Sequence, residues 1–214
     1  MSMKKFIIST LAIVFGLVFF APTAFAGGFN DASGDFPTVL VANDTQNPCG
    51  PSYSIGCWNT TVSANPGDVI SVQVFYHNTT NVTAPNVTIG LGPKNANATT
   101  SRTFYGGVAV NGSLAAQGSA LVRTYDAQTL TFIPGSVKWY PNASGTRALL
   151  ANEDTLFTAG GLPVGNIPGN TQGVVVASFR VSNNSTGGGG GNGGGDNNCN
   201  INSFTADEIG RAHV

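Results

Sequence analysis

The clearest pattern in the chain is an alternation of apolar and polar residues with a period of two. Between positions 69 and 77 the even positions are all apolar, whereas Ser71, Gln73 and His77 fall on the opposite face. The same rhythm recurs over 87–91 and 175–181, and it is typical of strands with one buried face. Strands are predicted over 38–42, 59–64, 69–77, 86–91, 102–110, 120–125, 129–132, 136–140 and 173–182.

Short clusters of Gly, Pro, Asn and Asp separate these segments. They include 65–68 (Asn-Pro-Gly-Asp), Asn111-Gly112, Pro134-Gly135 and Pro163-Val164-Gly165, which are turn or breaker signals. No stretch of ten or more residues shows a convincing helical period. Many short strands divided by turns indicate an all-β fold, an antiparallel β-sandwich of about 8–10 strands.

The first 26 residues have the features of a secretory signal peptide. Lys4 and Lys5 precede an apolar run over 6–20, and Ala24-Phe25-Ala26 supplies a cleavage site between small residues. The alternative is a membrane anchor, but this run is short for a span of about 20 residues. We therefore expect a secreted or cell-surface protein without a transmembrane segment in its mature part.

Composition divides the remainder of the chain. Residues 27–35 form a polar lead, residues 36–182 form one domain, and residues 183–198 form a linker of Gly and Asn with an unbroken glycine run over 187–191. Such a linker is expected to behave as a flexible coil. The last seven residues, 208–214, resemble the translation of a sequencing adapter, which predicts that the natural protein continues beyond Asp207. The alternative is a genuine polar C-terminus.

The charge balance excludes several function classes. Between Gly27 and Asp207 there are six basic and nine acidic side chains, too few cations for electrostatic binding of nucleic acid. Only His77 represents histidine in that span, which leaves little for His-dependent catalysis or a multi-His metal site. We assign no catalytic residue, metal ligand or cofactor.

The cysteines suggest one bridge. Cys49 and Cys57 lie eight positions apart, and in an oxidising compartment a disulfide between them is the expected state. The alternative is a metal site, but two thiolates without a nearby His or second Cys pair do not fill a tetrahedral shell. Cys199 follows the linker, and we expect its partner in the continuation of the chain.

Two segments carry a resemblance to a known family. Residues 65–79 combine a Pro-Gly-Asp turn with an alternating strand ending in Tyr76-His77-Asn78, and Asn86-Val87-Thr88 lies in the next strand. This resembles the conserved-repeat domain of bacterial surface proteins, catalogued as domain of unknown function eleven. The resemblance implies an immunoglobulin-like sandwich in exported proteins, often in tandem arrays. Residues 199–207 are similar to the first strand of another such module.

Three aromatic residues are candidate ligand contacts. Trp58, Trp139 and Tyr140 could form a platform on which sugars stack, or they could pack inside the sandwich. Packing is favoured for Trp139, whose neighbours fit the alternation, and both interpretations stay open for Trp58. Glu153-Asp154 is predicted to be a solvated turn rather than a cation site, and His77 a loop-packing residue rather than part of a catalytic triad.

These features favour a non-enzymatic function. The leading hypothesis is an exported structural or adhesive module of a bacterial cell-surface protein, whose partners are neighbouring modules and components of a cell wall or of a host or neighbouring cell surface. The alternative is a carbohydrate-binding module that uses exposed aromatic residues. A hydrolase is the least favoured class.

Overall fold

The computed structural model describes residues 28–48, 57–95, 97–142, 148 and 150–182. The predicted signal peptide, the linker, the start of a second module and the adapter-like end all lie outside the described residues. Cys49 and Cys199 lie outside them as well. In the described ranges there is no helix long and apolar enough to cross a bilayer.

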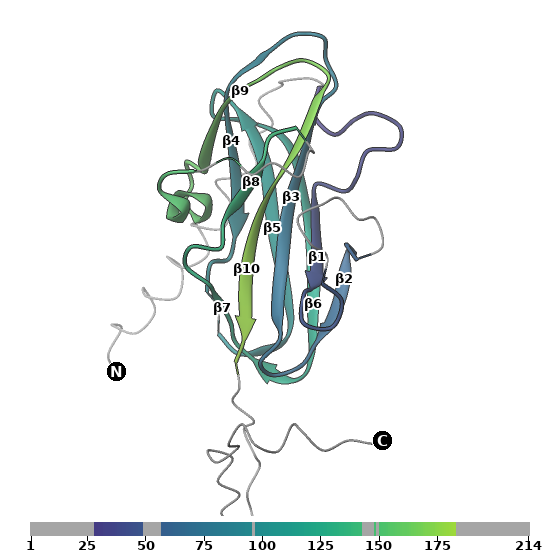
Figure 1. Ribbon diagram of the computed structural model, residues 1–214, viewed down its shortest axis with the longest axis vertical. Coiled ribbons are helices and arrows are strands. Elements are labelled where there is room, and N and C mark those ends of the chain that lie inside the picture. The colour runs from purple at the N-terminus through teal and green to yellow at the C-terminus, as the bar shows by residue number, and fades with distance from the viewer. Residues whose placement is uncertain (1–27, 49–56, 96, 143–147, 149, 183–214) are drawn as a thin grey trace, which may run out of the picture.

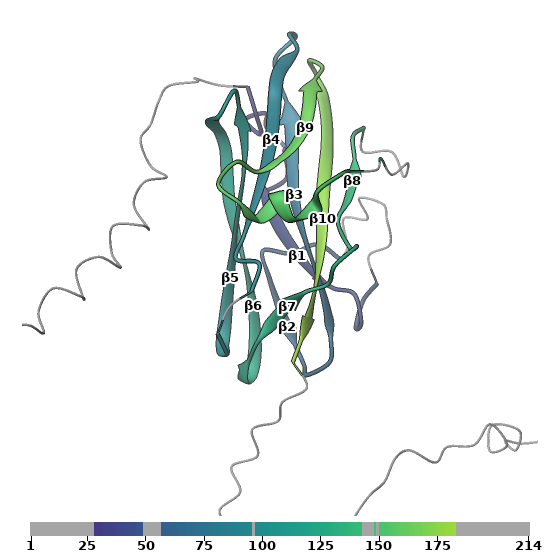
Figure 2. The same cartoon turned by 90° about the vertical axis from the view of Figure 1, so that its left-hand side faces the viewer.

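The described chain is all-β, and its strands form two sheets that pack face to face (Figures 1 and 2). Sheet A contains β1 (Val39–Asn43), β3 (Val69–Asn78), β10 (Thr171–Val181), β7 (Leu130–Phe132) and β8 (Lys138–Tyr140). Sheet B contains β2 (Thr61–Ala64), β6 (Ser113–Gln128), β5 (Thr99–Val110), β4 (Ala84–Gly92) and β9 (Leu162–Ile167). The predicted β-sandwich is confirmed. Every strand pair is antiparallel except β2 with β6, which is parallel.

The neighbours within each sheet are those of an immunoglobulin sandwich. That fold places strands A, B, E and D in one sheet and C, F and G in the other. The order β1-β3-β10-β7 in sheet A and the run β4-β5-β6 in sheet B reproduce these neighbours. The order along the chain differs, however. β5 and β6 occupy the places of strands F and G, yet they come earlier in the chain than β7 and β10, which occupy the places of strands D and E. The arrangement is therefore immunoglobulin-like with its own order of connections.

The core lies between the inner faces of the two sheets. The inward residues of β3 predicted from the alternation, Ile70, Val72, Val74 and Tyr76, are all completely buried. Phenylalanine rings fill the centre in tilted and edge-on contacts, with centroid distances from 4.6 to 6.1 Å, and such contacts add to the stabilisation from buried area. These rings belong to Phe104, Phe132, Phe157 and Phe179.

The turns use the residues that the sequence assigns to them. Asp68 follows Pro66-Gly67, is buried, and accepts a hydrogen bond from the Asn65 amide at 2.9 Å, as expected for a side chain that closes a turn. Asn111-Gly112 joins β5 to β6 with positive φ at both residues, which is the type I′ hairpin geometry.

Two elements differ from the sequence-based expectation. The Pro163-Val164-Gly165 segment is predicted from the sequence to break the chain, but it lies inside β9, an edge strand paired only with β4 among the described strands. Proline is tolerated there because an edge strand leaves one row of amides unpaired. The strand predicted over 120–125 is also much longer and runs from Ser113 to Gln128 as β6.

The central pair of sheet A runs the length of the sandwich. β3 and β10 are paired in one continuous register from Thr171–Asn78 to Arg180–Val69. At one end Phe29 forms a bridge with Asn78. At the other, β10 finishes beside the turn before β3, where the Gly67 amide donates to the Val181 carbonyl at 3.1 Å. The described chain therefore begins at one end of the long axis and finishes at the other (Figure 1).

Candidate functional site

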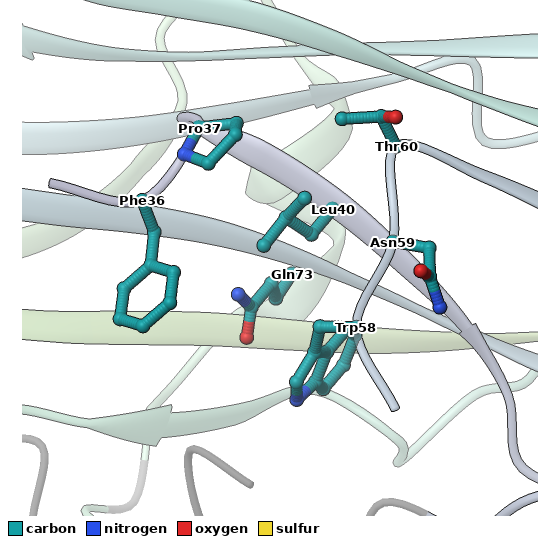
Figure 3. Close-up of a pocket in the computed structure, with 7 residues that line it drawn as sticks. All are labelled: Phe36, Pro37, Leu40, Trp58, Asn59, Thr60 and Gln73. Atoms are coloured by element: carbon teal, nitrogen blue, oxygen red, sulfur yellow. The ribbon is translucent and has the colours of Figure 1, made fainter. Parts of the chain in front are cut away.

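A pocket of about 300 Å³ lies on the outer face of sheet A, away from the core (Figure 3). Two aromatic side chains, Phe36 and Trp58, stand on either side of it, with Leu40 and the Gln73 carboxamide between them. Its lining residues are Phe36, Pro37, Leu40, Trp58, Asn59, Thr60 and Gln73. Cavities of this size lie at the lower end of the range for small-molecule sites, roughly 300–1,000 Å³.

The register between β1, β3 and β10 determines which side chains form the floor of the pocket. Leu40 on β1 lies directly opposite Gln73 on β3, and Val176 on β10 flanks Gln73 on its other side. Because alternate residues of a strand point to opposite faces, these three side chains leave sheet A on the side away from the phenylalanine core. They form one row across the sheet, which continues to Lys138 on β8.

Trp58 forms one wall of the pocket, and the backbone of the next residue, Asn59, attaches this wall to β1. The Val41 amide donates to the Asn59 carbonyl at 2.8 Å, and the Asn59 amide donates to the Val41 carbonyl at 2.9 Å. This pair of bonds holds the 57–60 segment against the edge of sheet A. The half-buried indole of Trp58 packs against Ala42 and the buried Cys57.

The opposite wall belongs to Phe36, which follows the lead and precedes β1. The Phe36 ring meets Phe75 edge-on, with a centroid distance of 5.5 Å. The Asn30 side-chain amide donates to Thr38 Oγ1 at 3.0 Å and to the Phe75 carbonyl at 2.9 Å. The lead is thereby fixed on top of β3, and Phe36 is held beside the Gln73 carboxamide rather than left on a loose segment.

Gln73 is the unusual residue of this pocket. It is only 3% exposed, and within the described part of the chain its carboxamide makes no hydrogen bond. Figure 3 shows that carboxamide between the Phe36 ring and the Trp58 indole, directed into the pocket. Its oxygen and nitrogen are not among the fully enclosed, unpaired side-chain atoms of the described residues, so the carboxamide is open to the pocket and to water.

The chemistry of the pocket is neutral. Its polar lining groups are the carboxamides of Gln73 and Asn59 and the hydroxyl of Thr60, and each of them both donates and accepts hydrogen bonds. No Asp, Glu, Lys, Arg or His is among the seven described lining residues. The arrangement suits the binding of a neutral, partly apolar group, and it supplies no acid or base.

The three aromatic candidates from the sequence do not form one platform. Trp58 lines the pocket. Trp139 lies on the inward side of sheet A, half-buried against the core, where its indole Nε1 donates to Tyr76 Oη at 2.9 Å. Tyr140 belongs to the outer face but is 4% exposed, packed with Phe75 and Val174. The packing role favoured for Trp139 agrees with this placement.

Tyr76 completes the support behind Trp139. Its hydroxyl accepts from the Trp139 indole and donates to the Pro141 carbonyl at 3.2 Å. Burial raises the pKa of Tyr76 to about 12, although the hydrogen bond from Trp139 acts in the opposite direction. The phenol therefore stays neutral throughout the physiological pH range and serves as a fixed hydrogen-bonding group.

The ionisable side chains considered from the sequence are held by neighbours. His77 Nδ1 lies 2.7 Å from Asp35 Oδ1, which ties the lead to the end of β3. Glu153, in the 3₁₀ helix η2 (Glu153–Phe157), accepts from the Gly135 and Val137 amides. Asp154 pairs with Lys94 at 2.7 Å. Glu153 and Asp154 are thus engaged separately, and they do not converge on a common point.

The predicted disulfide involves one described residue. Cys57 is buried, 6% exposed, under Trp58, whereas Cys49 lies outside the described residues. The bridge between them stays a prediction. Among the residues that the structure describes, no three His, Cys, Asp or Glu side chains gather into a metal-binding group.

Sequence reasoning identified Trp58 but not the rest of the pocket. From the sequence alone, Phe36 is only the first residue of the domain, and the alternation assigns Gln73 to the polar face of its strand. The signal for Gln73 was weak, because its burial depends on segments that cross over sheet A from elsewhere in the chain. Phe75 at the next outward position, an aromatic residue between Gln73 and His77, was the available hint that this face is covered.

Comparison with known proteins adds no relative: no family model, no curated protein and no solved structure matches the chain.

Proposed function

We propose that the chain is a non-catalytic structural module of an exported cell-surface protein, which sets the spacing between its neighbours and carries tension along the chain. The observation behind this proposal is the course of the backbone. The described chain begins beside the end of β3 at Asn78 and finishes with β10 beside Val69, at the opposite end of the sandwich. Modules connected in this way line up end to end.

The strand geometry suits a pull along this axis. Tension between the two ends draws β10 and the lead in opposite directions, parallel to the strands. The hydrogen bonds between antiparallel strands lie perpendicular to the strands, so the continuous β3–β10 register from Thr171 to Arg180 is sheared as a unit. Bonds loaded together resist more force than bonds that open one after another.

The outer surface and the ionisable groups agree with a non-catalytic role. His77, Glu153 and Asp154 are each occupied by an ion pair or by backbone amides. The exposed face of sheet B carries mainly neutral and hydroxyl-bearing side chains along β5 and β6, including Ser101, Ser119 and Tyr105. The signal peptide and glycine linker expected from the sequence support a position outside the cell and a further module after the linker.

Single-molecule pulling tests this role with two attachment geometries. Handles on the two chain ends shear β10 against β3. Handles on cysteines introduced at Asn81 and Asn170, two exposed residues beside the same end of that pair, unzip it instead. We expect one cooperative rupture in the first geometry, a gain of about 500 Å in contour length for residues 28–182, and a several-fold lower force in the second. Equal forces in both geometries contradict the proposal.

A further inference from the structure

We propose that the pocket between Phe36 and Trp58 binds one ring of a neutral carbohydrate, with the Gln73 carboxamide as its central hydrogen-bonding group. This site is independent of the tension-bearing role. It lies on the outer face of sheet A, and the ends of the described chain lie at the two ends of the long axis.

The first argument is the position of Gln73. Its neighbours across the sheet are Leu40 and Val176, and it is 97% buried. Buried polar groups in folded proteins are normally paired, and the Gln73 oxygen and nitrogen, which are not enclosed without a partner, open instead into the pocket. Within the described residues the carboxamide has no partner, and it faces the pocket (Figure 3). A ligand that both donates and accepts there completes the site.

The second argument is the shape of the walls. Phe36 is fixed by its edge-on contact with Phe75, and Trp58 by the Val41–Asn59 backbone bonds. Both aromatic side chains are half-buried, so each presents part of its surface to the cavity. Ligand sites commonly combine such aromatic walls with a few placed polar groups. The C–H face of a pyranose ring fits an aromatic wall, and its hydroxyls fit the carboxamide.

The third argument is charge. No charged residue is among the lining residues in the described part of the chain, and the other polar lining residues are Thr60 and Asn59, whose side-chain amide also donates to the Cys57 carbonyl at 3.1 Å. A nucleotide or another phosphate ligand needs cationic or backbone donors, and a quaternary ammonium favours nearby carboxylates as well as aromatic faces. Sugar hydroxyls, which both donate and accept, match amides and hydroxyls that do the same.

The test uses the secreted chain and defined probes. An array of neutral glycans selects the best binder, and titration calorimetry then measures its tetrasaccharide form. Choline chloride, AMP and a proline-rich decapeptide represent the other ligand classes. We expect saturable binding of at least one neutral glycan at one site, and weaker or no binding of the three comparison probes. Absence of binding across the array, or tighter binding of a comparison probe, overturns the proposal.

Three variants locate the site. Trp58→Ala removes one wall, Gln73→Met removes the carboxamide but keeps the size of the side chain, and Tyr125→Ala removes an aromatic ring that is 96% exposed on sheet B. We expect the first two to weaken glycan binding by at least about tenfold, and the third to leave it unchanged. Gln73→Met removes no hydrogen bond within the described residues, so the midpoint of thermal unfolding should stay nearly unchanged, which separates a binding role from a structural one.

A fluorescence measurement covers the case in which a pocket variant does not fold. The chain contains two tryptophans, so Trp139→Phe leaves Trp58 as the only indole. Glycan titration should then shift or quench the Trp58 emission with the same dissociation constant as calorimetry gives. Binding that leaves this emission unchanged, or that Gln73→Met does not weaken, places the glycan elsewhere and refutes the assignment.

Discussion

The outer faces of the two sheets differ sharply, although the same alternation of residues produces both. On β3 in sheet A the outward side chains Ser71, Gln73 and Phe75 are at most 4% exposed. On β5 and β6 in sheet B the outward side chains Tyr105 and Tyr125 are 65% and 96% exposed. An alternating strand thus has one face in the core in both sheets, but only sheet B leaves its other face to solvent at these positions.

The difference arises from what crosses over sheet A. Phe36, just after the lead, and the Cys57–Trp58 segment pack on its outer face, against residues such as Phe75 and Ala42. A polar residue on this face must therefore pair with the protein or open to water. Ser71 pairs with both Asp44 and Ser178, whereas Gln73 has no protein partner among the described residues and opens into the pocket.

The largest effect is expected from paired truncations on the two outer faces. Phe75→Ala should destabilise the protein by about 3–5 kcal/mol, because it empties a buried site next to Phe36 and Tyr140. Tyr105→Ala, on the exposed face of sheet B, should change stability by at most about 0.5 kcal/mol. Chemical denaturation of both variants gives the comparison, and similar losses for the two show that the faces are not different in burial.

A somewhat smaller loss of stability is expected at alkaline pH, and it arises from Tyr76, the inward-facing neighbour of Phe75 on β3. The pKa of Tyr76 is raised to about 12 in the folded protein, against about 10 in an unfolded chain. Between these values the folded state holds the proton that the unfolded state has lost, so stability falls as pH rises from 10 to 12, by roughly 2–3 kcal/mol.

Denaturation curves at pH 9 and pH 11.5 measure this loss, and Tyr76→Phe is its control. The variant cannot ionise at this position, so its decline with pH should be smaller than that of the unaltered protein. At pH 9 it should already be less stable by about 1–3 kcal/mol, because the Trp139 indole loses its acceptor. An identical pH dependence in both proteins shows that Tyr76 is not the group responsible.

Substitutions of Ser71 and Gln73 compare two covered polar residues on the outer face of sheet A, one with protein partners and one without any among the described residues. Ser71→Ala should cost about 1–2 kcal/mol, since it leaves Asp44 and Ser178 without a common partner. Gln73→Met removes a carboxamide that has no protein partner among the described residues and is open to the pocket, so stability should change by at most about 0.5 kcal/mol. A loss on Gln73→Met as large as that on Ser71→Ala shows that the Gln73 side chain has a structural role in the sheet.

The smallest effect is expected for the contact between Asp31 in the lead and Thr79, just after the end of β3. The Thr79 hydroxyl donates to the Asp31 carboxylate, as does the Gly28 amide, and these bonds keep the pKa of Asp31 below its usual value of 3.8. Because the folded pKa is lowered, the contribution of this tie is present above pH 3.8 and is lost as pH falls through the folded value. NMR titration should show the pKa of Asp31 rising toward 3.8 in Thr79→Val.

Most of the sandwich was predictable because strand periodicity is a local property. The alternation at 69–77 identified the inward face of β3, and Asn111-Gly112 identified the β5–β6 hairpin, since positive φ at both positions favours these two residues. β9 was missed because Pro163 and Gly165 act as breakers in a central strand, and only its place at the edge of sheet B makes them acceptable.

The candidate site was much less predictable, because its parts come from three separate segments. Phe36, Trp58 and Gln73 meet only through the β1–β3 register and the bridge between Val41 and Asn59. No local pattern reports that a polar residue on an outward position will be covered by a distant segment. The resemblance to the conserved-repeat domain of bacterial surface proteins stays a prediction, as do export and the Cys49–Cys57 bridge.

The central claim is that the chain passes through a rigid sandwich from one end to the other. Spin labels on Ala32→Cys and Arg180→Cys, with Cys199→Ser to remove the remaining predicted free thiol, allow this span to be measured by electron–electron distance spectroscopy. From the ten-residue length of β3 the separation should be roughly 30 Å with a narrow distribution. A separation below about 20 Å, or a broad distribution, contradicts a rigid in-line module.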